Sequence, residues 1–431
     1  NRTLTLGGVG SGTLTLSAAN TYSGTTRINA GTLSISSDSN LGTAPGTATA
    51  GSLVINGGTL LASTGFTLNA NRGITLGPAS SSGAGTINVA AGTLSYAGII
   101  ANNTSGTGSL VKTGSGTLSL SGANTYTGNT IIGGGTLAFG ASRALGGFLV
   151  LGGSSGAATV GAFDLTSASG TFGGLTVQAP TSGTSNTNLR VTGATAGVGT
   201  WSIVNSQSNG FMQVGVSSST TGNIAVLDLS GLGTFNANLS GTASVFRVGA
   251  NSSLSTTVAT ATATLAVSST ITAKTIGVGD VSGQNAMHTL LLGGGSSALN
   301  ADTLAVGNTG LNGGRSQGQI LFSGTAGSVT LRAQNGTGRG NITMVSNGGQ
   351  STATAPSGTI DFRGHTADIL TGTLAMMALA SGSTGSGTST FSFDQGTFDA
   401  TTLTLGMVAV PTGTGGSPVM NNVVNQSGGI M

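Results

Sequence analysis

Four residues near the C-terminal end have the types and the spacing that could do chemistry. They are Asp361, Arg363, His365 and Asp368. Clustered carboxylates can act as acid and base on a polysaccharide or bind calcium, so a sugar or metal site is one interpretation. Charged side chains also pair on surfaces that have no activity. We favour this second interpretation and expect surface ion pairs.

A local repeat extends this cluster. The segment 362–376 can be laid on 393–407 with a shift of 31 positions (393 − 362). This alignment adds Asp394 and pairs Asp368 with Asp399. It also pairs Thr373 with Thr404 and Leu374 with Leu405. Like residues one coil apart would stack in parallel strands, so we predict that Asp368 and Asp399 form surface or assembly contacts.

Other catalytic groups are scarce. The chain has two histidines, nine acidic residues and no cysteine, and all nine acidic residues are aspartate. Serine is so common that a Ser/His/Asp arrangement cannot be located by spacing. No glycine-rich segment lies between a strand and a helix, as a phosphate loop requires. We therefore predict no enzyme activity, no cofactor and no metal. A β-helix enzyme acting on polysaccharides stays as the weaker alternative.

Two tyrosines occupy equivalent places in the chain and are the next candidates for contacts. Tyr22 follows Asn20, and Tyr126 follows Asn124, each two positions later. One interpretation is a surface ladder that stacks on sugars or on a partner. The other, which we favour, is a corner side chain that covers the edge of a coil, because aromatic residues commonly serve packing.

The tyrosines belong to a repeated unit. Residues 10–35 read GSGTLTLSAANTYSGTTRINAGTLSI, and residues 114–139 read GSGTLSLSGANTYTGNTIIGGGTLAF. The copies are 104 positions apart (114 − 10), and 17 of 26 aligned residues are identical. Leu14 and Leu16 alternate with threonines, as in a strand with one buried face. The unit reads as strand, corner and strand, and such repeats bury their apolar faces against one another.

The wording SGTLTLSAANTYSGTT and SGTLSLSGANTYTGNT resembles the autotransporter-associated β-strand repeat, also called the passenger-associated transport repeat. The resemblance implies a bacterial, secreted or surface-displayed passenger folded as a right-handed parallel β-helix. It brings no catalytic residues, because the repeat is architectural. The fold expected is therefore an all-β, elongated β-solenoid rod.

Composition supports the same class. Charged residues make up 5% of the chain and 79 of 431 residues are glycine, whereas globular domains average about 25% charge. Residues that suit helix surfaces are nearly missing, and Thr, Val and Ile favour strands. A hydrophobic content of 37% argues against disorder. No apolar run approaches the roughly 18 residues of a spanning helix, and the scattered cations form no nucleic-acid footprint.

The repeats suggest three parts: regular coils over 1–140, degenerate coils over 141–310 and further coils over 311–431. In the second part, the segments 272–279 and 300–307 have similar sequences. We expect a segment of a longer chain or a mature processed subunit, with a structural role as a stalk, adhesin-like passenger or matrix component. Open end coils are templates for pairing, so a self-assembling extracellular fibre is the alternative. Surface glycans or host and matrix proteins are the partners expected besides the chain itself.

Overall fold

The computed structural model describes residues 2–8, 10, 12–140, 143–151, 159–165, 170–178, 186–193, 197–215, 224–249, 260–280, 286–307, 316–345, 356–379, 387–408, 420–428 and 430. The chain forms two compact units. Unit 1 comprises Asn1–Gly152, Thr159–Gly173 and Leu189–Thr195, and unit 2 comprises Gly153–Ala158, Gly174–Asn188 and Ala196–Met431. The division into three parts drawn from the sequence remains a prediction.

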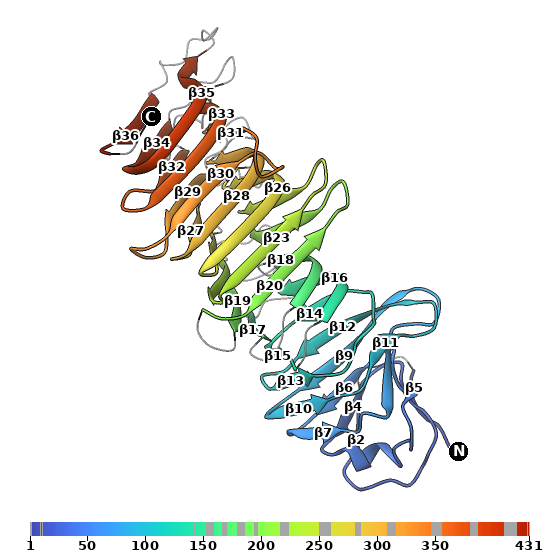
Figure 1. Cartoon of the computed structure of the whole chain (residues 1–431). Coiled ribbons are helices and arrows are strands. Elements are labelled where there is room, and N and C mark those ends of the chain that lie inside the picture. The colour runs from blue at the N-terminus through green and yellow to red at the C-terminus, as the bar shows by residue number, and fades with distance from the viewer. Residues whose placement is uncertain are drawn as a thin grey trace. The chain divides into compact units, whose positions relative to one another are not determined.

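Unit 1 is built from short parallel strands and one 3₁₀ turn, η1 (Asp38–Leu41) (Figure 1). The strands are β1 (Leu4–Leu6), β2 (Thr13–Leu16), β3 (Thr26–Ile28), β4 (Thr32–Ile35), β5 (Thr49–Ile55), β6 (Thr59–Ala62), β7 (Phe66–Leu68), β8 (Arg72–Leu76), β9 (Ser82–Val89), β10 (Thr93–Tyr96), β11 (Ile100–Asn102), β12 (Thr107–Thr113), β13 (Thr117–Leu120), β14 (Thr130–Ile132), β15 (Gly135–Phe139), β16 (Arg143–Leu151) and β17 (Thr159–Leu165).

These strands stack into three sheets, which we call A1, B1 and C1. Sheet A1 has the order β1-β3-β5-β8-β11, sheet B1 runs β2-β4-β6-β9-β12-β14-β16, and sheet C1 runs β7-β10-β13-β15-β17. Along the chain from β6 to β13 the strands visit B1, C1 and A1 in turn, and each pairs in parallel with a strand one coil away. Unit 1 is therefore a parallel β-helix, as the sequence predicts.

The core of unit 1 consists of columns of side chains, one from each coil. One column on sheet B1 contains Leu14, Leu33, Leu60, Ile87, Lys112, Ile132 and Leu151. Alternation along each strand places these side chains inside and the threonines between them outside. Burial of apolar surface, at about 25 cal/mol per Å², stabilises the stack, and hydrogen bonds between strands run from coil to coil.

The two repeat copies lie on different faces of unit 1. The first copy places its strands in B1, A1 and B1 (β2, β3, β4), and the second places them in C1, B1 and C1 (β13, β14, β15). In both copies the flanking strands pair 19 residues apart, Thr13 with Thr32 and Thr117 with Thr136. The shared sequence thus forms the same strand–corner–strand shape at two different positions around the coil.

Unit 2 has longer coils with two stacked sheets. Its strands are β20 (Thr200–Asn205), β21 (Phe211–Gly215), β22 (Ile224–Gly231), β23 (Thr234–Leu239), β24 (Val245–Val248), β25 (Thr260–Thr264), β26 (Ser268–Val278), β27 (Met287–Leu292), β28 (Ser296–Val306), β29 (Gln317–Phe322), β30 (Ser328–Arg332), β31 (Gly340–Met344), β32 (Ser357–Asp361), β33 (Thr366–Leu379), β34 (Gly387–Phe393), β35 (Gln395–Val408) and β36 (Met420–Gln426). Strands β18 (Gly170–Gln178) and β19 (Asn186–Gly193) cross the boundary of the units.

One sheet of unit 2, which we call C2, has the order β22-β25-β27-β29-β32-β34-β36. The other, B2, contains long strands that pair over both halves. The first half of β26 pairs with β23 and its second half pairs with β24. Strand β28 pairs in the same way with β30 and β31. The similar segments 272–279 and 300–307 lie side by side in register, Thr272 with Asn300 and Val278 with Val306.

The register between β33 and β35 differs from the sequence alignment. Asp368 lies opposite Thr397, and Asp399 lies opposite Leu370, a shift of 29 positions (397 − 368) where the sequence suggested 31. Leu374 accordingly pairs with Leu403 and not with Leu405. A difference of two residues keeps every side chain on its face, so residue identity alone could not distinguish the two registers.

Candidate functional site

The charged cluster predicted near the C-terminal end separates into two groups in unit 2. The first lies at the corners that follow β32 and β34. Arg363 Nε donates to Asp361 Oδ1 over 2.8 Å, and the backbone N–H of Gly364 donates to Asp394 Oδ1 over 2.8 Å. His365 is buried and stacks on Phe322 with ring centroids 3.7 Å apart. These contacts stabilise the corners.

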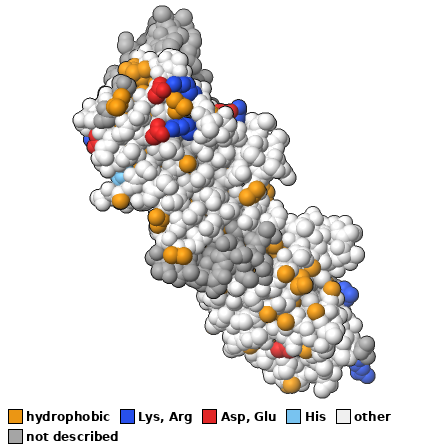
Figure 2. All heavy atoms as spheres, in the orientation of Figure 1, with side chains coloured by type: hydrophobic (Ala, Val, Ile, Leu, Met, Phe, Trp, Pro, Cys, Tyr) orange, Lys and Arg blue, Asp and Glu red, His pale blue; other side chains and the backbone are white. Residues whose placement is uncertain are grey.

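The second group lies on the outer face of sheet B2. Arg332 pairs with Asp368 over 2.5 Å, and Arg339 pairs with Asp399 over 2.7 Å. Red and blue atoms lie in adjacent pairs on this face in Figure 2, on a surface that is otherwise mostly uncharged. Asp368 and Asp399 therefore each contact an arginine and do not stack on each other, contrary to the ladder expected from the sequence.

The electrostatics of these carboxylates suit ion pairing. Hydrogen bonds from Arg363 and Arg339 lower the pKa values of Asp361 and Asp399, respectively, and a hydrogen bond from Lys274 lowers that of Asp302. A general acid at neutral pH needs a raised pKa, so these groups are poor proton donors. Within the described residues, no three His, Cys, Asp or Glu side chains gather closely enough to hold a metal ion.

A loop of residues 333–339 separates β30 from β31 and ties several coils together. The side chain of Gln334 donates to the carbonyl oxygens of Leu239 and Gly241, each over 3.1 Å. Its backbone N–H donates to Asp302 Oδ1 over 3.0 Å, and Asp302 also pairs with Lys274 over 2.6 Å. Sequence reasoning did not identify this network, because its members are far apart in the chain.

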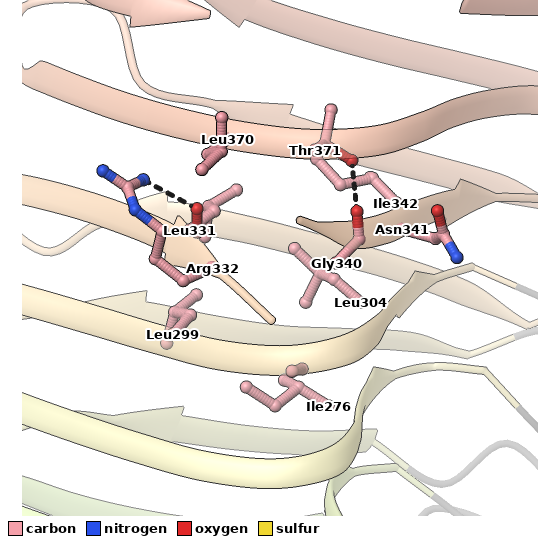
Figure 3. Close-up of a pocket in the computed structure, with 11 residues that line it drawn as sticks. Ile276, Leu299, Leu304, Leu331, Arg332, Gly340, Asn341, Ile342, Leu370 and Thr371 are labelled. Atoms are coloured by element: carbon pink, nitrogen blue, oxygen red, sulfur yellow. Dashed lines mark hydrogen bonds between the residues drawn. The ribbon is translucent and has the colours of Figure 1, made fainter. Parts of the chain in front are cut away.

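A small cavity is lined by residues at the end of β30 and the start of β31, together with residues of β26, β28 and β33 (Figure 3). Thr371 Oγ1 donates to the carbonyl of Gly340 over 2.8 Å at its edge, and the close-up shows Leu299, Leu304 and Ile342 in its wall. Its volume is about 10 Å³, close to the space that one water molecule requires. The cavity is therefore too small for an organic ligand.

The outer face of B2 carries a regular column of mostly polar side chains, one from each coil. We call it the polar column: Ser202, Asn236, Thr270, Ala298, Thr330, Asp368 and Thr397. A second row beside it contains Asn238, Thr272, Asn300 and Arg332. Neighbouring rungs are about 4.8 Å apart. Hydroxyl and amide groups repeated at this spacing offer hydrogen-bonding positions along a flat surface.

The tyrosines and asparagines of the repeats lie at corners of unit 1. Tyr126 is 1% exposed and shares a 2.6 Å hydrogen bond with Thr130, and burial raises its pKa. Asn124 is also buried, and its side-chain oxygen accepts a hydrogen bond from Ile100 N over 2.9 Å. A surface ladder of stacking tyrosines is therefore excluded at Tyr126, because its ring is packed inside the coil.

The first copy has the same contact in a more exposed setting. Tyr22 is half-buried and shares a 2.8 Å hydrogen bond with Thr26. Asn20 Nδ2 donates to the carbonyl of Asn40 over 2.8 Å, which fixes the corner to the next coil. Tyr22 and Asn20 thus hold a corner, and any contact with a partner remains a prediction for these two residues.

Two comparisons with known proteins agree with this architecture. The passenger-associated transport repeat matches residues 9–35 and 110–139. The chain is similar to the adhesin BmaC autotransporter of Brucella suis biovar 1 (strain 1330), with 44% identity over 130 residues. That similarity covers 28% of this chain and 4% of the relative's length. No solved structure matches the chain. In the described residues, no helix has the length and apolarity needed to cross a membrane.

Proposed function

We propose that this chain is part of a non-catalytic passenger that a bacterium secretes or displays on its surface, where it acts as an adhesin-like structural protein. The polar column of sheet B2 is the observation that carries the proposal. It provides hydroxyl and amide groups in a regular row. The row does not enclose a cavity, and none of its residues is suited to act as a general acid. Two transport repeats and a similar stretch in an autotransporter adhesin support the location and the role.

The partners that fit this surface are matrix proteins or glycans with many hydrogen-bonding groups. Each contact would be weak, because hydrogen bonds to exposed groups exchange with water. Many weak contacts along a stiff surface add up when they engage together. A surface of this kind suits adhesion, in which avidity matters more than the affinity of one site.

Bead adhesion tests the proposal. Beads coated with the folded chain should bind cultured host cells or immobilised matrix. Thr270→Lys combined with Thr330→Lys places two long charged side chains in the polar column and should reduce binding at least about tenfold through lost avidity. The control is Thr359→Lys on sheet C2. Thr359 is half-buried, as Thr330 is, and its replacement should leave binding unchanged. Equal binding by all three proteins would refute the assignment to B2.

Assembly into a fibre is a second proposal, and β35 favours it. Leu403 and Leu405 on this strand are 43% and 48% exposed. Beside them lies a hollow of about 400 Å³, lined in part by Phe398 and Ile430. One edge of β35 pairs with β33. On its other edge, the described residues form one isolated bridge, between Thr397 and Ile430. Electron microscopy of the purified chain should show filaments, and Leu403→Lys should abolish them. Dispersed particles at every concentration would count against assembly.

A further inference from the structure

Unit 1 has a polar groove of about 520 Å³ on the side of strands β1, β3 and β5. Hydroxyl-bearing residues make up half of its wall: Thr3, Ser23, Thr25, Thr43, Thr49 and Ser52. None of the residues that line it is aromatic. The volume falls within the range of roughly 300–1,000 Å³ typical of small-molecule sites.

Hydrogen bonds to neighbouring coils hold the loop that forms one wall. The N–H of Thr43 donates to the carbonyl of Tyr22 over 2.8 Å. Asn71 Nδ2 donates to the carbonyl of Pro45 over 2.9 Å, and the N–H of Thr49 donates to the carbonyl of Asn71 over 2.9 Å. Because the loop is tied at both ends and in its middle, the groove is formed before any ligand arrives.

A β-bulge shapes the opposite wall. In the pairing of β5 with β8, Thr49 lies opposite Arg72, and the next pair is Leu53 with Ile74. Three residues of β5 therefore face the single residue Gly73. A side chain at Gly73 would come within 2.6 Å of the carbonyl oxygen of Thr49, so the close approach requires glycine. Bulges turn side chains out of the regular sheet, and here Ser52 lies in the wall of the groove.

The groove carries no free charge. Arg72 is its one charged wall residue, and it is 4% exposed. Its guanidinium donates to both carboxylate oxygens of Asp38 and to the carbonyl oxygens of Leu41 and Gly42. A charged ligand would gain no opposite charge, whereas hydroxyls such as those of Thr25 and Thr43 can both donate and accept.

From these observations we infer that the groove binds a neutral saccharide of one or two sugar rings. The inference extends the proposed adhesive function to a defined glycan site in unit 1. Without an aromatic platform, binding lacks the stacking contribution that rings supply. We expect a dissociation constant on the order of 1 mM, equivalent to about 4 kcal/mol. Multiple copies on one cell would raise the overall strength of attachment.

Saturation-transfer difference NMR tests the site with lactose, maltose and N,N′-diacetylchitobiose as probes and galacturonate as the anionic comparison. Gly46→Phe should fill the groove. A Cβ at Gly46 meets no atom within 4 Å, and its backbone is not in the left-handed region. Gly324→Phe in unit 2 is the matched control, because Gly324 has the same open surroundings. Thr25→Val and Thr43→Val remove hydroxyls at nearly constant volume. Circular dichroism verifies folding of each variant.

The inference predicts signals from at least one disaccharide with the wild-type chain and with Gly324→Phe. It predicts loss of those signals with Gly46→Phe and a several-fold weakening with each valine variant. No signal from the three disaccharides, equal signals from Gly46→Phe, or stronger signals from galacturonate would overturn it. The bead assay separates the two claims: if the wild-type chain gives no disaccharide signals but its coated beads still adhere, the groove assignment is refuted and the adhesive role is left intact.

Discussion

The ammonium group of Lys112 donates a 3.1 Å hydrogen bond to the carbonyl of Gly134, one coil further along unit 1. Lys112 lies in the interior column between Ile87 and Ile132 and is fully buried. Its Nζ also donates to the carbonyl oxygens of Thr113 and Gly114. A charged group in an aliphatic column is thus satisfied by three carbonyls and by no carboxylate.

We expect Lys112 to make the stability of unit 1 depend on alkaline pH. Burial lowers its pKa from 10.5 to about 8. Between these values the unfolded chain binds a proton that the folded chain does not, so stability rises as pH increases through this window. Lys112→Met lacks this titration and keeps a similar shape. Urea unfolding from pH 8 to 10.5 should show the wild type gaining stability relative to the variant, and parallel pH profiles would contradict the assignment.

His288 should have an effect at acidic pH in unit 2. Its side chain is 1% exposed between Ala261 and Gly318, and neither ring nitrogen has a hydrogen-bond partner. Burial lowers its pKa from 6.5 to about 4. Between these values the unfolded chain binds the proton, so roughly 3 kcal/mol of stability is lost as pH falls through the window.

Thermal unfolding of wild type and His288→Leu between pH 6.5 and 4 measures this effect. The wild type should lose stability more steeply as pH falls. Above pH 6.5 the difference in stability between the two proteins should no longer change with pH, because only the difference in packing remains. The same slope in both proteins would show that His288 is not the responsible group.

The buried pair of Arg72 and Asp38 should matter more than the exposed pair of Arg363 and Asp361. Arg72 closes the end of η1 through the carbonyls of Leu41 and Gly42. Arg72→Met leaves these oxygens without their donor and leaves Asp38 with the N–H of Asn69 but without its cationic partner. Breaking a buried pair costs about 3–5 kcal/mol, whereas exposed pairs contribute less than about 1 kcal/mol. Denaturant unfolding of Arg72→Met and Arg363→Met compares them, and equal losses would disprove the distinction.

The two repeat copies provide a matched pair for the tyrosine hydroxyl. Tyr126→Phe leaves the buried hydroxyl of Thr130 without its partner, which should cost about 1–3 kcal/mol. Tyr22→Phe removes the same bond at a half-buried corner, where water can replace it, and should cost less than about 1 kcal/mol. Urea midpoints of the two variants measure the difference, and a larger loss in Tyr22→Phe would reverse the interpretation.

Much of the architecture was predictable from residue patterns. The alternation of Leu14 and Leu16 with threonines indicated strands with one buried face, and the structure places both leucines in interior columns of sheet B1. The two repeat copies indicated a stacked coil. Residues 272–279 and 300–307 were recognised as related in sequence, and the structure pairs them in register. These features are local, because strand alternation and turn residues act over a few positions.

The candidate site was predictable only in part. Asp361 with Arg363 could be anticipated from their closeness in the chain, but the partners of Asp368 and Asp399 come from residues 332 and 339. The interior position of Lys112 emerged only from its pairing with Ile87 and Ile132 in the structure, because lysine is ordinarily a surface residue. The groove of unit 1 depends on a bulge and on hydrogen bonds between coils, which no local pattern encodes.

By itself, therefore, the sequence determined the class of fold, the alternation of buried and exposed side chains and the scarcity of catalytic groups, since these follow from residue type and short spacing. Only the tertiary structure decided the register of β33 on β35, the burial of Tyr126 and the arginine partners of Asp368 and Asp399. Coil lengths vary from 19 residues between Thr13 and Thr32 to 40 between Gln317 and Ser357. Which residues meet across coils is consequently set by loop lengths and side-chain packing over long separations.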